Sequence, residues 1–126
     1  MSYIRADVLS AANGTSATTL TGQVAAKGWV NFNGSGVATA RRSFNISSLT
    51  YNGTGNYTLS FTNSFVDGSY ALVATCDKQA ATGYYTKTVN IIENNPPTAS
   101  SVQICTDYPG NTSNESKLYI MVTITI

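Results

Sequence analysis

The chain has 126 residues, a formal net charge of +1 and a charged fraction of only 10%, and it contains no histidine. Its length predicts one domain, which can bury enough apolar surface to fold without a metal or a disulfide. The missing histidine excludes Ser-His-Asp and Cys-His catalysis and most zinc sites, and the scarcity of Lys and Arg argues against nucleic-acid binding through a basic face.

Threonine, serine and asparagine take the place of the missing charged residues, and tyrosine is abundant. Threonine and tyrosine favour pleated strands, whereas asparagine, serine and glycine favour tight turns, so we expect an all-β protein.

No apolar run is long enough to span a membrane, and residues 1–7 lack the pattern of a signal peptide. The charge-poor composition nevertheless resembles that of extracellular adhesive proteins. A virion component, synthesised in a host cytoplasm and acting outside it, would combine both properties.

Residues 1–26 are the least patterned part of the chain. Small residues dominate the stretch 10–17, and the large apolar residues of this part are too few to form a core: Ile4, Val8, Leu9, Leu20 and Val24. We therefore expect an N-terminal arm that docks on the main domain or on a neighbouring subunit, with a flexible tail as the alternative. The main domain is then expected over residues 27–126.

Strand signals follow one another closely after residue 28. The expected strands cover residues 29–32, 37–40, 43–49, 57–62, 70–76, 84–92, 102–106 and 117–126. The Asn-Gly turn at 52–53 lies between two runs of period-two apolar spacing, which is a strong hairpin signal. The segment 70–76 is apolar on both faces, so we expect a central strand there. Seven to nine strands with short connections predict an antiparallel, jelly-roll-like β-sandwich that carries the short N-terminal arm.

The last expected strand has the clearest pattern. Leu118, Ile120, Val122, Ile124 and Ile126 occupy alternate positions, so they lie on one face of the strand. Such an apolar stripe needs a second sheet to cover it. We therefore expect this strand to be central in a sheet or to be part of a subunit interface.

Several large apolar residues on these strands are expected to form the core. They are Trp29, Phe32, Phe44, Tyr57, Phe61, Ile120 and Val122. Trp29 has a second interpretation, because a flat aromatic ring can stack on a sugar, but we favour the core. Cys76 and Cys105 lack the spacing of a metal site, and we expect two half-buried thiols, with a disulfide as the alternative.

Two pairs of adjacent residues are candidates for ligand or subunit contact. Tyr84 and Tyr85 are consecutive, so in a strand one of the two rings must face away from the core. That ring could contact a host-surface glycan or another subunit, because tyrosine is enriched at interfaces. Arg41 and Arg42 also face opposite ways in an extended chain. Most such pairs are solvated, but one arginine could pair with a carboxylate of a neighbouring subunit.

The acidic residues give no indication of catalysis. A glycosidase needs two cooperating carboxylates, whereas the six acidic residues of this chain lie mostly beside turns. They are Asp7, Asp67, Asp77, Glu93, Asp107 and Glu115. The loop 31–36 contains no carboxylate, so we expect a hairpin turn there rather than a calcium site. The expected protein is therefore not an enzyme and uses no metal or other cofactor.

Three segments carry a family resemblance: KGWVNFNG at residues 27–34, RSFNISS at 42–48 and NGTGNYTLSF at 52–61. Together they resemble a module of tail-fibre-like and other structural proteins of tailed bacteriophages, notably phages of marine bacteria and cyanobacteria. The resemblance covers residues 27–76 and includes no catalytic residue.

The resemblance implies a bacteriophage virion structural protein, displayed as an oligomeric β-sandwich of the tail-fibre, knob or adhesin type that could bind a host surface. One alternative is a capsid decoration, cement or head-fibre protein, and a second is a soluble carbohydrate-binding module. Analogy with phage fibres and knobs suggests a homotrimer, in which residues 1–26 contact other virion proteins. Neither nucleic-acid binding nor membrane insertion is expected.

Overall fold

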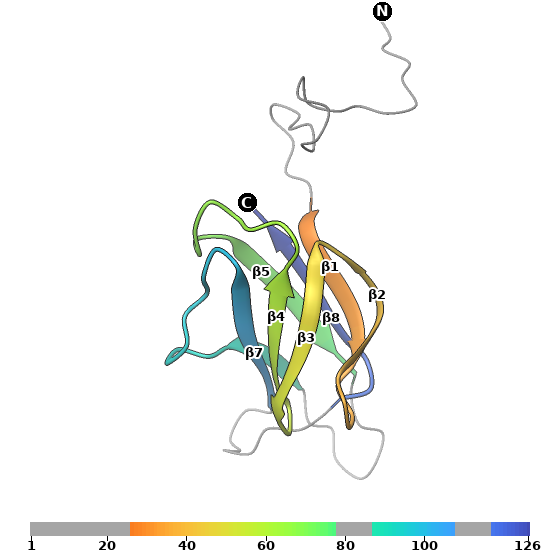
Figure 1. Ribbon diagram of the computed structural model, residues 1–126. Helices are drawn as coiled ribbons and strands as arrows, with labels where there is room; N and C mark the ends of the chain where they lie inside the picture. The colour runs from red at the N-terminus through yellow and green to blue at the C-terminus, as the bar shows by residue number, and fades with distance from the viewer. Residues whose placement is uncertain (1–25, 78–86, 108–116) are drawn as a thin grey trace, which may run out of the picture.

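The computed structural model describes residues 26–77, 87–107 and 117–126, and Figure 1 shows two sheets packed on one another. The strands are β1 (Ala26–Asn33), β2 (Thr39–Phe44), β3 (Ile46–Gly53), β4 (Asn56–Phe61), β5 (Ala71–Cys76), β6 (Thr88–Ile91), β7 (Ser101–Asp107) and β8 (Ile120–Thr125). The expected all-β antiparallel sandwich is confirmed for this part of the chain. The expected N-terminal arm lies outside the described residues, apart from its last position.

Each sheet has four antiparallel strands. One sheet has the order β2-β1-β8-β5 and the other has the order β3-β4-β7-β6. β8 lies between β1 and β5, so the C-terminal strand is central, and its residues Ile120, Val122 and Ile124 are buried. The apolar stripe is shorter than expected at both ends, because Leu118 and Ile126 are more than half exposed.

The position of β5 differs from the expectation. It is an edge strand of its sheet rather than a central strand. Leu72 and Ala74 pack against the core, whereas Val73, between them, is 68% exposed. The apolar residues on one face of this strand therefore pack against the core, whereas those on the other face point outward and are not covered by another element of the described structure.

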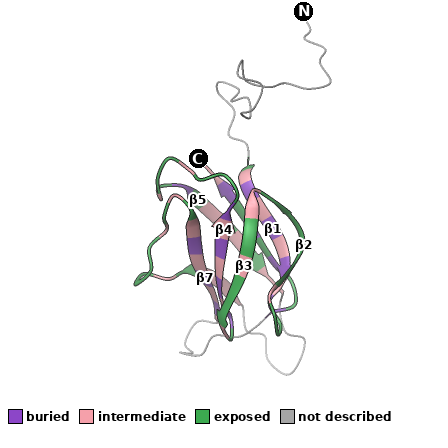
Figure 2. Ribbon diagram, viewed as in Figure 1, coloured by how far each residue is buried: buried purple, intermediate pink, exposed green. Residues whose placement is uncertain are grey.

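The core lies between the sheets and comes from alternate residues of the central strands. Figure 2 shows buried bands alternating along β4 and β7, whereas β2 is exposed over its whole length. The rings of Phe32 and Tyr57 meet edge to face in this core, with centroids 5.1 Å apart. The Tyr57 hydroxyl donates a hydrogen bond of 2.8 Å to the Gly34 carbonyl. A Cβ atom at Gly34 would collide with that hydroxyl, so the core packing requires glycine at this position.

A single residue, Asn45, carries the chain from one sheet to the other. It separates β2 from β3, which are edge strands of different sheets. Its φ of 58° lies in the left-handed region, which asparagine adopts more readily than most residues. Its Nδ2 donates to the carbonyls of Lys27 at 3.0 Å and Asn63 at 3.1 Å, and its Oδ1 accepts from the Asn63 N–H at 2.7 Å. The single strand expected over 43–49 is therefore wrong, because this corner divides it into two.

Candidate interaction surface

Side-chain alternation gives each sheet an outer face, and the face of the β2-β1-β8-β5 sheet carries most of the unusual side chains. The register aligns four residues in one row across all four strands: Phe44, Trp29, Thr123 and Val73. The next row on the same face is Arg42, Asn31, Met121 and Thr75. We call these two rows, together with Arg41 and Tyr119, the aromatic face.

The aromatic face exposes large apolar side chains in two neighbouring rows that run from the β2 edge to the β5 edge of the sheet. Phe44 is 53% exposed, Val73 68%, Met121 47% and Tyr119 54%. Trp29, directly opposite Phe44, is half-buried. Single exposed apolar residues are common on proteins and need no explanation, but a contiguous group is typical of an interaction site.

A β-bulge places Arg41 on this face. The register pairs Asn31 with Arg42 but the next residue of β1 with Ala40, so Arg41 is the extra residue of β2. The guanidinium carbon of Arg41 lies 4.3 Å from the centroid of the Tyr119 ring, and its Nη1 donates to Asn31 Oδ1 at 3.4 Å. A cation held over an exposed ring in this way contributes about 0.5–1 kcal/mol. The bulge therefore brings a positive charge next to the exposed aromatic residues.

Backbone hydrogen bonds fix the position of Tyr119. Its N–H donates to Asp77 Oδ1 at 2.8 Å, and its carbonyl accepts from the Asp77 N–H at 2.9 Å. The Asp77 carboxylate is thus engaged with the backbone, and the two rows of the aromatic face contain no acidic residue. With Arg41 and Arg42 present, the charge on this face favours a neutral or acidic partner.

The outer face of the β3-β4-β7-β6 sheet is different, because its side chains are polar and bind one another. Gln103 Nε2 donates to Asn56 Oδ1 at 2.7 Å, and Asn90 Nδ2 donates to Asp107 Oδ1 at 2.7 Å. Asn52 and Thr58 make a further bond of this kind at 2.8 Å. These groups already have partners within the chain. The aromatic face is therefore the stronger candidate for intermolecular contact.

The two cysteines belong to different sheets, and one faces inward while the other faces outward. Cys76 packs against the core from β5, and Cys105 lies on the polar outer face opposite Asn90. Both thiols are free and partly buried. Burial raises the pKa of each thiol above its ordinary value. The expectation of two half-buried thiols is confirmed, and the disulfide alternative is wrong.

The structure brings two of the four predicted contact residues together. Arg41 and Arg42 both lie on the aromatic face, because the bulge removes the alternation that an extended chain would give. Tyr84 and Tyr85 lie outside the described residues. The residues of the predicted core that are buried are Phe32, Tyr57, Phe61, Ile120 and Val122.

Trp29 and Phe44 do not belong to the buried core, contrary to the prediction. They form a cross-strand pair on the aromatic face, while Val30 faces inward from β1. The alternation of Phe44 and Ile46 suggested a common face, but Asn45 turns the chain between them. Ile46 therefore packs against the core and Phe44 faces outward. Because Trp29 is outside the core, its interpretation as a sugar-stacking residue stays open.

Sequence reasoning did not single out Tyr119, Met121 or Val73 as contact candidates. Tyr119 and Met121 alternate with the apolar stripe of the last strand, so this alternation indicates that they face away from the core. Val73 gave no such signal, because its neighbours in the sequence are also apolar.

A scan against protein-family models, a search of curated proteins and a search of solved structures gave no match for this chain. In the described residues no group of three or more His, Cys, Asp or Glu is arranged to hold a metal ion. The same part of the chain contains no helix long and apolar enough to cross a membrane. The aromatic face is therefore the candidate site on its geometry alone.

Proposed function

We propose that this protein is a non-enzymatic structural component of a bacteriophage virion and that it acts by contact through the aromatic face. The observation that carries the proposal is the difference between the two outer faces. One exposes Phe44, Val73 and Met121, whereas the polar side chains of the other bind one another. The assignment to a virion is supported by the resemblance of residues 27–76 to phage structural modules.

The proposed partner is another copy of the chain, in a trimer by analogy with phage fibres and knobs. About half of Phe44 and of Tyr119 is exposed. Burial of that half would remove roughly 100 Å² from water per ring, which stabilises a contact by about 2.5 kcal/mol per ring. A stable interface needs about 800 Å² per partner, so the contact must extend beyond the two rows to their rim.

Sedimentation of the full chain at micromolar concentration tests this proposal. We expect a trimer for the natural sequence and a monomer for Phe44→Ser combined with Val73→Ser. Both side chains are exposed, so the double variant should keep the stability of the fold within about 1 kcal/mol. Val66→Ser is the matched control, since Val66 is 98% exposed in the connection from β4 to β5. A monomeric natural chain, or a double variant that associates like the control, would contradict self-assembly through this face.

The position of the protein on the virion would distinguish a role in host adhesion from a role in capsid decoration. A label on the protein in intact particles would mark a few copies at the tail if the protein contacts the host. Many copies over the head would instead favour a decoration or head-fibre protein.

A carbohydrate-binding module is the second candidate, and the position of Trp29 favours it. The ring lies on an outer face in a row next to Asn31 and Arg42, which can donate hydrogen bonds to a saccharide. A glycan array with the natural chain and with Trp29→Ala tests this function. Absence of binding, or binding that Trp29→Ala leaves unchanged, would exclude it.

A further inference from the structure

Met121 is the only methionine in the described part of the chain, and it lies on the aromatic face. It belongs to β8, an inner strand, and its cross-strand neighbours are Asn31 on β1 and Thr75 on β5. Met121 is 47% exposed, whereas its sequence neighbours Ile120 and Val122 are buried in the core. The residue therefore has a fixed position in the sheet but presents its thioether side chain on the outer face.

The other sulfur atoms of the described residues are less open to an oxidant. Cys76 packs against the core, and Cys105 lies on the polar outer face of the other sheet. Both thiols are partly buried, and burial raises the pKa of each, so little of the reactive thiolate is present at neutral pH. A thioether carries no proton and needs no such ionisation. Among the described residues, Met121 is therefore the sulfur group that a peroxide should oxidise first.

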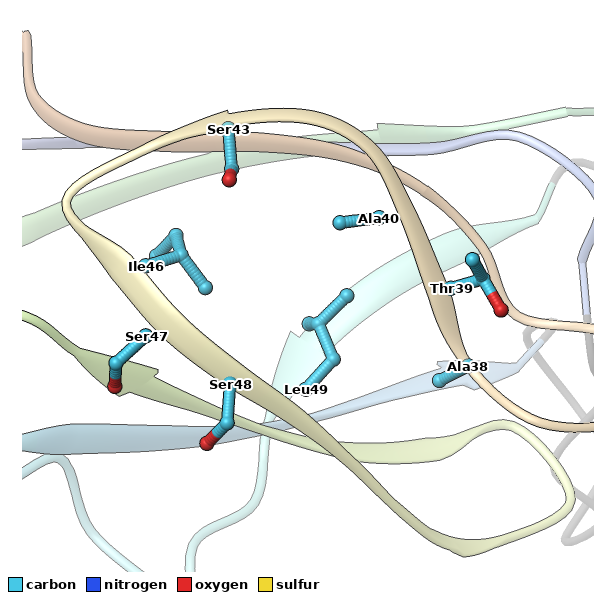
Figure 3. Close-up of a pocket in the computed structure, with 8 residues that line it drawn as sticks. All are labelled: Ala38, Thr39, Ala40, Ser43, Ile46, Ser47, Ser48 and Leu49. Atoms are coloured by element: carbon cyan, nitrogen blue, oxygen red, sulfur yellow. The ribbon is translucent and has the colours of Figure 1, made fainter.

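The cleft between β2 and β3 contains no group that competes for an oxidant. It has a volume of about 320 Å³, and Figure 3 shows Ala40 and Ser43 pointing into it from β2, and Ile46 and Leu49 from β3. All its lining residues are alanine, serine, threonine, isoleucine or leucine, and none of these contains sulfur. The oxidisable side chain is therefore on the aromatic face and not in the cleft.

Oxidation of Met121 by a hydroperoxide is a transfer of one oxygen atom. A lone pair of the sulfur attacks the terminal oxygen of the peroxide, so an S–O bond forms while the O–O bond breaks. The sulfur is oxidised from a thioether to a sulfoxide, and the hydroperoxide is reduced to water or an alcohol, which keeps the proton of the transferred oxygen. The side chain thereby changes from flexible and apolar to polar and chiral, and methionine sulfoxide reductases reverse the change.

A sulfoxide at this position is unfavourable for a contact through the aromatic face. Phe44 and Val73 on the same face are both more than half exposed, so a partner that covers them must present apolar surface. The sulfoxide oxygen is a hydrogen-bond acceptor, and an apolar surface offers it no donor in exchange for the water that it loses. Burial of a polar group without a hydrogen-bond partner weakens an association by about tenfold or more.

We propose that Met121 is an oxidation site and that its sulfoxide blocks association through the aromatic face. A hydroperoxide forms the sulfoxide on the unassembled chain, where the side chain is exposed. Association covers Met121, so chains that have already assembled are protected. The inference rests on the proposed self-association and adds a regulation of the same surface.

Sedimentation after peroxide treatment tests the inference, with Met121→Leu as the matched control. The full-length natural chain and the variant are treated with hydrogen peroxide at a chain concentration too low for association, and are then freed of peroxide and concentrated. Mass spectrometry of the peptide that contains Met121 measures the added oxygen. We expect the treated natural chain to associate at least about tenfold more weakly than the untreated one. Treatment should leave the association of Met121→Leu unchanged, because leucine has a similar size and forms no sulfoxide.

The control variant keeps Met1, Cys76 and Cys105, so damage to these residues would weaken its association as well. Equal weakening of both chains would therefore overturn the inference, and so would a natural chain with a complete sulfoxide at Met121 that associates like the untreated one. A second measurement compares the oxidation rate of Met121 below and above the chain concentration at which association occurs. We expect slower oxidation in the assembled chain, and equal rates would place Met121 outside the contact and reject the inference.

The outcomes distinguish this inference from the proposed function. An untreated natural chain that stays monomeric would contradict self-association itself and, with it, this inference. A chain that assembles but does not respond to oxidation of Met121 would leave the proposed function intact and reject the regulation alone.

Discussion

Replacement of Asn45 by alanine should destabilise the sandwich more than any other exposed or half-exposed polar substitution described here. Asn45 is the only residue between β2 and β3 and joins the two sheets. The substitution removes the three side-chain hydrogen bonds to Lys27 and Asn63. It also leaves alanine in the left-handed conformation at φ 58°, where its methyl group makes no hydrogen bond that would offset the backbone strain.

These losses can be converted into a free energy of unfolding. Three net hydrogen bonds, two of them exposed to solvent, contribute about 2 kcal/mol together. The left-handed backbone costs alanine about 1 kcal/mol more. The expected loss for Asn45→Ala is therefore about 3 kcal/mol, or a fall in Tm of about 12 °C at about 4 °C per kcal/mol. Asn45→Gly keeps the backbone conformation at little cost and should lose about 2 kcal/mol.

Urea unfolding of the natural chain and both variants, followed by circular dichroism, measures these differences. A free energy of unfolding for Asn45→Ala within about 0.5 kcal/mol of that of the natural chain would refute the role of the corner. Such a loss is smaller than the contribution of a single hydrogen bond, which is about 1 kcal/mol. A glycine variant less stable than the alanine variant would refute the conformational part of the reasoning.

Three other predictions follow from buried polar groups. Tyr57→Phe should cost about 1–2 kcal/mol in urea unfolding, because it leaves the buried Gly34 carbonyl without the Tyr57 hydroxyl. Burial raises the pKa of Tyr70 to about 12 from an ordinary value of 10, so its contribution to stability is complete below pH 10 and is lost as the pH rises through 12. Unfolding titrations from pH 9 to pH 12 should show this decline, and Tyr70→Phe should reduce it. Because burial raises both thiol pKa values, Cys76 and Cys105 should react with iodoacetamide at pH 8 more slowly in the folded chain than in urea, as measured by mass spectrometry.

The fold could be predicted from the sequence because its strands obey simple alternation. The run 120–125 has buried residues at every second position, as the pattern indicated. Prediction failed where a single residue interrupts the alternation of inward-facing and outward-facing side chains. Asn45 in the left-handed region reverses the face of Phe44, and the extra residue Arg41 brings two arginines to one face. A bulge or a corner cannot be recognised from the apolar periodicity of the sequence, so counting alternate residues across it assigns the following side chains to the wrong face of the strand.

The candidate site could be predicted only in part, because it depends on pairing between distant strands. Trp29 and Phe44 lie opposite each other only because β1 and β2 pair in one register, and Val73 joins them through β8. Local sequence carries the identity of these side chains but not their juxtaposition. Sequence alone identified Arg41 and Arg42 as contact candidates, and it had no means of placing them beside the exposed aromatic residues.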